Sequence, residues 1–166
     1  MKSASVIWGG WDGHQPEASV GRFVPFLKEQ GYQVTVSDTL SSFDDPERLL
    51  SLSLIVPCWT MGELKGDQEK HLLDSVRSGV GIAGWHGGMG DAFRSQTDYQ
   101  FMVGGQFVGH PGGCIEYTVN IVKKDDPIVA GLPDFRMHSE CYYMHVDPSN
   151  NVLATDSAGP APESLI

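Results

Sequence analysis

The sequence predicts an α/β fold with a mostly parallel sheet that helices cover on both faces. Short apolar runs rich in β-branched residues alternate with segments of helical periodicity, and the connections between them are short and rich in glycine. Strands that alternate with helices are joined by crossovers and therefore lie parallel. The 166 residues are enough for a single domain with a substantial core, and a single domain over 1–166 is expected.

The first strands and helices follow from local patterns. The run 4–8 is β-branched and aromatic and ends at two glycines, which is typical of a strand followed by a loop. A helix is predicted to begin at Pro16 and to stop at Gly31, because apolar residues recur between them at helical spacing. The segment 32–36 alternates as a second strand, and a short helix is expected from Pro46.

A third strand is predicted over 52–57. Pro57 is expected to end it, since proline breaks an interior ladder bond, so residues 58–60 fall in the loop that follows. The apolar stripe of 67–78 predicts a helix in which His71 is exposed.

The next strand breaks into glycines around one imidazole, in the run Gly84-Trp85-His86-Gly87-Gly88. Small residues on either side of a central position are the spacing of a nucleophile elbow, in which a strained turn lifts one side chain above the carboxyl end of a sheet. The central imidazole can act as a general base, an electrophile or a metal ligand. The alternative is a histidine that only bonds its own turn.

The second half of the chain is less regular. The elements expected there are a helix over 92–103, a loop over 106–113 that carries His110, and strands over 115–121, 135–145 and 152–155. Clean alternation over 115–121 favours an antiparallel or edge strand with one wet face. The tail 157–162 has the composition of a linker.

Loops after parallel strands meet at one edge of the sheet, and ligands bind there. The loops 9–14, 58–62 and 85–91 are therefore expected to converge. Glu140 stands in a run of aromatic residues and methionine, where a partly buried carboxylate needs a partner; the alternative is a solvated charge on an edge strand. The expected catalytic residues are His86, His110 and Glu140, and the expected substrate contacts are His14, Trp85, Asp91 and Tyr142.

A zinc ion is a further option at this edge, with His14, His86 and His110 as its ligands. The histidines are dispersed, and no HExxH pair supports the site. The four tryptophans near strand ends suit either core packing or stacking on the apolar faces of sugar rings.

Composition excludes several classes of partner. Lys and Arg number 11 against 21 Asp and Glu, a net charge of -10 that repels nucleic acid and anionic membrane surfaces. Three dispersed cysteines make a disulfide framework a poor interpretation and fit a reducing, cytoplasmic location. The N-terminus has no long apolar core that would direct export. A homo-oligomer is left open.

The elbow, the segment 104–111 and the run 139–143, together with the glycine-rich loop after the first strand, resemble the ThuA-like (trehalose utilisation) family over residues 6–155. That family is similar in fold to the class I glutamine amidotransferases, so the resemblance implies a flavodoxin-like three-layer sandwich with the elbow at its active edge. The elbow cysteine of the amidotransferases corresponds to His86, so hydrolysis of glutamine by a thiolate is not available there. Such proteins usually continue past the last strand, and a C-terminally shortened member is expected.

The resemblance implies a role in carbohydrate metabolism, on trehalose or related disaccharides and their oxidised derivatives. The favoured hypothesis is an enzyme that acts on a sugar or keto-sugar through loop histidines and a glutamate. The alternative is a non-catalytic sugar-binding or regulatory module that has kept the cleft without the thiol. A glutamine amidase that uses Cys58 or Cys114 is disfavoured, because neither has elbow spacing.

Overall fold

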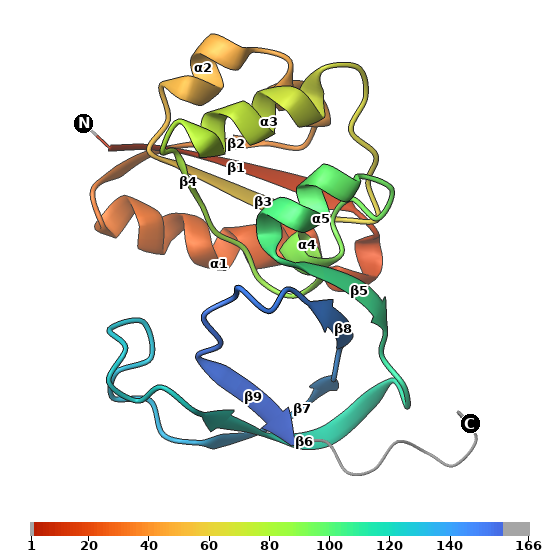
Figure 1. The fold of residues 1–166 in the computed structure, drawn as a ribbon. Coiled ribbons are helices and arrows are strands. Elements are labelled where there is room, and N and C mark those ends of the chain that lie inside the picture. Colours follow the sequence, from red (N-terminus) through yellow and green to blue (C-terminus); the bar gives the residue numbers. More distant parts are fainter. Residues whose placement is uncertain (1, 158–166) are drawn as a thin grey trace. The chain divides into compact units, whose positions relative to one another are not determined.

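The computed structural model describes residues 2–157, and these divide near Gln106 into two compact units (Figure 1). The first unit is a parallel sheet with helices, and the second consists of short, largely antiparallel strands. This division does not test the expectation of a single domain, which stays a prediction. Except for Ser157, the tail expected to be linker-like lies outside the described residues.

The sheet of the first unit confirms the predicted parallel arrangement. Its strands are β1 (Lys2–Gly10), β2 (Tyr32–Ser37), β3 (Leu54–Thr60) and β4 (Gly81–Ile82), in the order β2-β1-β3-β4. In this flavodoxin-like order the connections diverge between β1 and β3, which is the switch point where ligands bind in open α/β sheets. The loops after β1 and β3 therefore flank the expected site.

Short helices join and cover these strands. They are α1 (Pro16–Glu29), α2 (Pro46–Leu50), α3 (Gln68–Arg77), α4 (Gly87–Gly90) and α5 (Thr97–Val103), with 3-10 turns η1 (Asp12–His14) and η2 (Leu40–Phe43). The starts at Pro16 and Pro46 agree with the sequence prediction, and the Asp45 carboxylate accepts a hydrogen bond from the Arg48 N–H as the cap of α2. The helix expected over 92–103 begins only at Thr97. Within residues 2–157, no helix is long and apolar enough to cross a membrane.

Alternate residues of the central strands face two different layers. Ile7 packs with Leu49 and Leu72 on the face covered by α2 and α3, whereas its neighbour Val6 packs with Val20 on the face covered by α1 (Figure 1). Successive side chains of a strand point to opposite faces, so a run that is apolar throughout is needed to fill both layers. The three-layer arrangement therefore follows from the buried runs 4–7 of β1 and 55–58 of β3, in which Ser5 is the one polar residue.

The prediction that Pro57 ends the third strand was wrong. β3 continues to Thr60 and stays paired with β1 through Gly10. On its other side, β4 pairs only with Leu54 and Ile55, so from Val56 onward β3 has one strand neighbour. A proline there need not remove a ladder bond, because its missing N–H can face the side without a strand.

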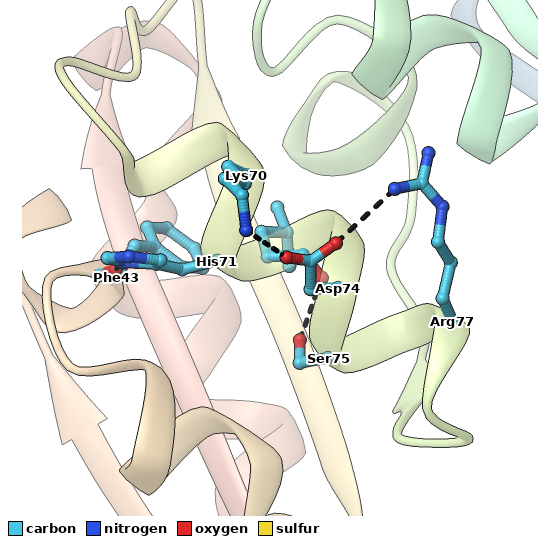
Figure 2. A network of polar contacts seen from close by, with 7 residues as sticks. Phe43, Lys70, His71, Asp74, Ser75 and Arg77 are labelled. Atoms are coloured by element: carbon cyan, nitrogen blue, oxygen red, sulfur yellow. Dashed lines mark hydrogen bonds and ion pairs between the residues drawn. The ribbon is translucent and has the colours of Figure 1, made fainter.

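His71 was expected to be exposed, and this too was wrong. It is half-buried on α3, where its Nδ1 lies 2.9 Å from the carbonyl oxygen of Phe43 (Figure 2). The contact ties α3 to η2, and it explains a polar residue on the inner side of an amphipathic helix.

The second unit contains two small sheets. Their strands are β5 (Gly105–Gly109), β6 (Cys114–Ile121), β7 (Phe135–Glu140), β8 (Tyr143–Val146) and β9 (Ala154–Ser157). β5 pairs with β8, and β6 lies between β7 and β9 in an antiparallel sheet. The antiparallel strand expected over 115–121 is confirmed, although it is central and not an edge.

Other expectations for this unit need correction. The segment 106–113, predicted to be a loop, begins as strand β5, which pairs with β8. The strand expected over 135–145 is interrupted at residues 141–142, and the one expected from Val152 begins at Ala154. Each difference depends on pairing with a distant strand, which local alternation does not encode.

Two adjacent leucines on α2 test the core assignment. Leu49 is 0% exposed and Leu50 is 50% exposed. Leu49→Ala leaves a cavity between α2 and the sheet and should lower the free energy of unfolding by about 2–5 kcal/mol. Leu50→Ala is the matched control and should change it by about 0.5 kcal/mol or less. Urea denaturation followed by circular dichroism measures both; equal effects would contradict the assignment.

Candidate active site

The backbone at His86 has the strained geometry of an elbow. His86 has φ 50 and ψ -139, a region that residues with a side chain rarely adopt, and it directly precedes α4. The N–H groups of Met89 and Gly90 donate back to its carbonyl oxygen and close the first turn. The turn therefore presents an exposed imidazole after β4, as the sequence predicted.

The glycines around His86 permit close approaches that a methyl group would block. A Cβ on Gly84 would lie 2.5 Å from the Cβ of Met89, and one on Gly88 would lie 3.1 Å from the Cα of Cys58. The first approach folds the turn tightly, and the second lets α4 rest on the backbone of β3. The Gly-x-His-x-Gly spacing thus has a steric reason at both ends.

Tyr99 of α5 supports the elbow from the other side. Its hydroxyl donates a hydrogen bond to the carbonyl oxygen of Met89 at 2.9 Å, and its ring is buried against Phe93. Burial raises the pKa of Tyr99, so the hydroxyl stays protonated as a donor at physiological pH. The short α4 is therefore anchored on β3 and on α5.

The three loops expected to converge do so within the first unit. The imidazoles of His14, after β1, and His86, after β4, have centroids 4.9 Å apart at an angle of 73°. The loop after β3 reaches both neighbours: the Trp11 N–H donates to the carbonyl of Thr60, and the Met61 N–H donates to the carbonyl of Asp91. The prediction of one edge lined by these loops is confirmed.

Thr60 is a site residue that the sequence reasoning missed. Its buried hydroxyl lies 3.0 Å from Nδ1 of His14, a hydrogen bond that orients the ring. Gly87 leaves room for this pair, because a Cβ there would lie 2.6 Å from Cε1 of His14 and 3.0 Å from Oγ1 of Thr60. The available signal was a hydroxyl within 58–62, one of the three loops expected to converge.

Strained backbone gathers at this edge. Among the described residues, the non-glycine positions with positive φ are Gln15, Met61 and His86. Each follows a different strand of the sheet, β1, β3 and β4. Such conformations cost about 1–3 kcal/mol each and cluster at active sites. Their distribution marks this edge independently of residue chemistry.

Trp85 and Asp91, both expected to contact substrate, are engaged within the protein. The indole of Trp85 stacks on Phe23 at a centroid distance of 4.1 Å. The Asp91 carboxylate is 3% exposed and is paired in a bidentate manner with Arg94, at 2.5 Å from Nε and 2.8 Å from Nη2. These contacts stabilise the residues on either side of the elbow, and a further contact with substrate stays a prediction.

A second cluster lies within the second unit. His110 follows β5, and its Nε2 is 3.7 Å from Oε1 of Glu140, the last residue of β7. This is an ion-pair distance when the ring is protonated, and the carboxylate is only 17% exposed. Tyr142 stacks on His110 at 6.3 Å, and Phe107 meets Tyr142 edge-on at 4.6 Å. Phe107 was not predicted, and its aromatic side chain in a glycine-rich run was the available signal.

The histidines of the first unit also suit a metal ion. A ring nitrogen of His14 and one of His86 lie within 4.8 Å of each other. Zinc accepts imidazole nitrogens, and a ligating histidine is typically held through its other nitrogen, as Thr60 holds His14. The two imidazoles therefore fit as two of four zinc ligands, and the role expected for His110 stays a prediction.

The thiols do not replace the missing elbow cysteine. Cys58 is buried beneath α4, and burial raises its pKa to about 11, so it is protonated at neutral pH. Cys141 is also buried, and burial together with the nearby Asp156 raises its pKa, whereas Cys114 is exposed. Cys58 is therefore not an activated nucleophile.

Comparison with known proteins points to one family. The model of the ThuA family, described as trehalose utilisation, matches residues 3–161. The solved structure of a ThuA-like protein from Bacteroides uniformis ATCC 8492 aligns with a TM-score of 0.78 at 17% identity, covering 94% of this chain and 68% of that one. At this identity the likeness shows the fold, and it confirms the predicted α/β class. No curated protein matches the chain.

The space that Gly87 leaves for His14 can be tested by filling it. Gly87→Ala places a methyl group against the His14 ring, so we expect a shift of its imidazole resonances in NMR spectra and a loss of about 1–3 kcal/mol of stability. Gly21→Ala on α1 is the control, because a Cβ there meets no atom within 4 Å. It should be neutral or slightly stabilising. Unchanged His14 resonances in Gly87→Ala would contradict the packing.

Thiol reactivity tests the burial of the cysteines. At pH 8 the folded protein should react rapidly with Ellman's reagent at one thiol, Cys114, and slowly at Cys58 and Cys141. Cys114→Ser should remove the rapid phase, and denaturation should expose the remaining thiols. A rapid phase that survives in Cys114→Ser would mean that a buried thiol is activated.

Proposed function

The chain belongs to the ThuA family of trehalose utilisation, and from this we propose that it processes a sugar or keto-sugar derived from trehalose or a related disaccharide. The observation that carries the proposal is the imidazole pair His14–His86, held at the switch-point edge of the sheet by a strained elbow. Proteins keep such strain where it positions a reacting group. The reaction class proposed is proton transfer by general acid–base catalysis.

His86 is the proposed proton carrier. An imidazole is the side chain best suited to accept and return a proton near neutral pH. A keto-sugar has weakly acidic C–H bonds next to its carbonyl, and every sugar has hydroxyl protons that must move when a bond to oxygen is made or broken. The elbow holds the ring outward from a fixed backbone, so little orientation has to be gained on binding.

His14 is proposed to bind substrate and to assist His86. The Thr60 hydroxyl fixes the His14 ring through Nδ1, and this ring lies edge-on to the His86 imidazole with the centroids 4.9 Å apart. Two adjacent imidazoles supply an acceptor and a donor when one is neutral and the other protonated. Thr60 is then a positioning residue, and Trp85 and Asp91 are proposed as further substrate contacts beside the elbow.

The cluster of His110, Glu140 and Tyr142 in the second unit is proposed to contribute separately to catalysis and to sugar binding. Glu140 and His110, 3.7 Å apart, place a carboxylate and an imidazole side by side, and the two can exchange a proton with a sugar hydroxyl or bind it by hydrogen bonds. Tyr142 offers an aromatic face suited to the apolar C–H face of a sugar ring. Catalytic roles for His110 and Glu140 are proposed on this basis.

A sugar-binding or regulatory module without turnover is the second candidate. It is favoured by the imidazole at the elbow, which replaces the nucleophile, and by the protonated state of the buried Cys58.

Zinc at His14 and His86 would supply a Lewis acid that polarises a sugar oxygen. Ligand-dependent thermal stabilisation without turnover selects the module, and activity that is lost with a chelator and restored by zinc selects the metal.

The proposal predicts a steep effect of one substitution. His86→Ala should lower turnover of trehalose, related disaccharides or their 3-keto derivatives by about 10²–10⁴-fold, the usual contribution of a positioned acid–base group. His110→Ala and Glu140→Gln should each lower it as well. His138→Ala, an exposed histidine on β7, is the control and should leave it unchanged.

Turnover is measured by product analysis on the folded variants, checked by circular dichroism. Full activity of His86→Ala on every substrate that the wild type processes would exclude the catalytic elbow. Loss of activity in His138→Ala as well would point to general destabilisation.

A further inference from the structure

A groove between α3 and α5 is separate from the residues assigned to sugar chemistry. It has a volume of about 300 Å³, and its apolar walls are formed by Leu73, Val76, Phe101 and Met102. The two helices lie side by side in the first unit (Figure 1). Glu69 of α3 accepts a hydrogen bond from the N–H of Tyr99 and fixes α5 against α3. The groove is therefore a feature of packed helices within one unit.

One wall of this groove is an unusually exposed aromatic side chain. Phe101 is 79% exposed, the highest value among the large apolar side chains of the described residues. On α5 it lies three residues after Asp98 and next to Met102, so it shares the outer face with the groove. Its neighbour Tyr99 faces the core instead. The same face thus carries a projecting ring and a hollow of a size that can receive one.

The rim of the groove carries both signs of charge. Arg77 at the end of α3 and Asp98 in the first turn of α5 both line it. Arg77 is 72% exposed, and it shares Asp74 with Lys70, at 3.3 Å and 2.5 Å (Figure 2). The Lys70 ammonium beside it lowers the pKa of Asp74, which keeps that carboxylate ionised. A partner at this face would therefore meet the carboxylate of Asp98 and the guanidinium of Arg77, which stays largely exposed although it is paired with Asp74.

We propose that the face formed by Leu73, Arg77, Asp98, Phe101 and Met102 binds a second copy of this chain in a two-fold dimer. A two-fold interface uses the same patch on both partners, so each residue that needs a complement must find it on that patch. This face meets the requirement twice: Phe101 of each copy enters the groove of the other, and Arg77 of each copy pairs with Asp98 of the other.

Repulsion between the copies is weaker than the net charge suggests. Each chain carries a net charge of -10, which opposes association at low ionic strength. At physiological salt the Debye length is about 8 Å, so charges away from the interface are largely screened. Contacts within the face then decide the affinity, and a modest interface of this kind gives a reversible dimer.

Sedimentation velocity at 0.15 M salt, with protein between about 1 µM and 1 mM, tests the proposal on the full chain. The wild type should shift from monomer to dimer across this range. Phe101→Glu should weaken association by at least about 30-fold, as removal of a central hot spot does. Phe26→Glu, at a 54% exposed phenylalanine on α1 across the sheet, should leave it unchanged (Figure 1).

A charge swap tests whether Arg77 of one copy pairs with Asp98 of the other, as opposed to a nonspecific effect of surface charge on association. Arg77→Glu and Asp98→Lys should each weaken the dimer, and the double variant should restore it because each new pair again has opposite signs. Circular dichroism confirms that each variant is folded. A monomeric wild type at all concentrations, a dimer that survives Phe101→Glu, or a double variant weaker than both single variants would overturn the proposal.

Discussion

The arrangement of the first unit depends on how closely α4 approaches β3. A Cβ on Gly88 would lie 3.1 Å from the Cα of Cys58 and would push the two elements slightly apart, and a Cβ on Gly84 would clash with the side chain of Met89 at 2.5 Å. His86 takes its strained conformation directly before α4, and the hydrogen in place of a Cβ at Gly87 leaves room for the His14 ring beside it. The cost of the strained backbone, about 1–3 kcal/mol, is offset by the buried layers on both faces of the sheet.

The first unit was largely predictable because its local patterns agree with its tertiary environment. Buried parallel strands require unbroken apolar runs, and the surrounding helices require apolar stripes and caps, so each element is encoded by its own residues. Pro57 is an exception, because its effect on the strand is not encoded by its own residue type. Whether a proline interrupts a strand depends on the neighbouring strand that faces its nitrogen. Here β4 is so short that it pairs only with Leu54 and Ile55, so β3 can continue through Pro57. In the second unit, strand limits depend on distant pairing, and predictions were less accurate.

In the candidate site, too, some features could be predicted from the sequence and others depend on tertiary packing. That the loops carrying His14 and His86 meet follows from topology, since loops after parallel strands share an edge. The role of Thr60 does not, because it depends on the direction of one side chain at the end of β3 and on the space left by one glycine. Phe107 and Tyr142 meet because β5 pairs with β8, a contact between segments far apart in the sequence. Residue type and spacing identify a candidate, whereas its partner has to be read from the packing.

The elbow also limits the chemistry that this scaffold can perform. A nucleophile elbow serves covalent catalysis when its central side chain is a thiol or hydroxyl that a base can activate. Here the central side chain is itself a base, and the thiol beneath it, Cys58, is protonated because burial raises its pKa to about 11. The geometry that would aim a nucleophile therefore aims a proton acceptor, with a second imidazole 4.9 Å away. Under the proposed function, a change of one residue type at a fixed backbone position would move the site from covalent toward acid–base chemistry, while the steric requirements on its glycines stay the same.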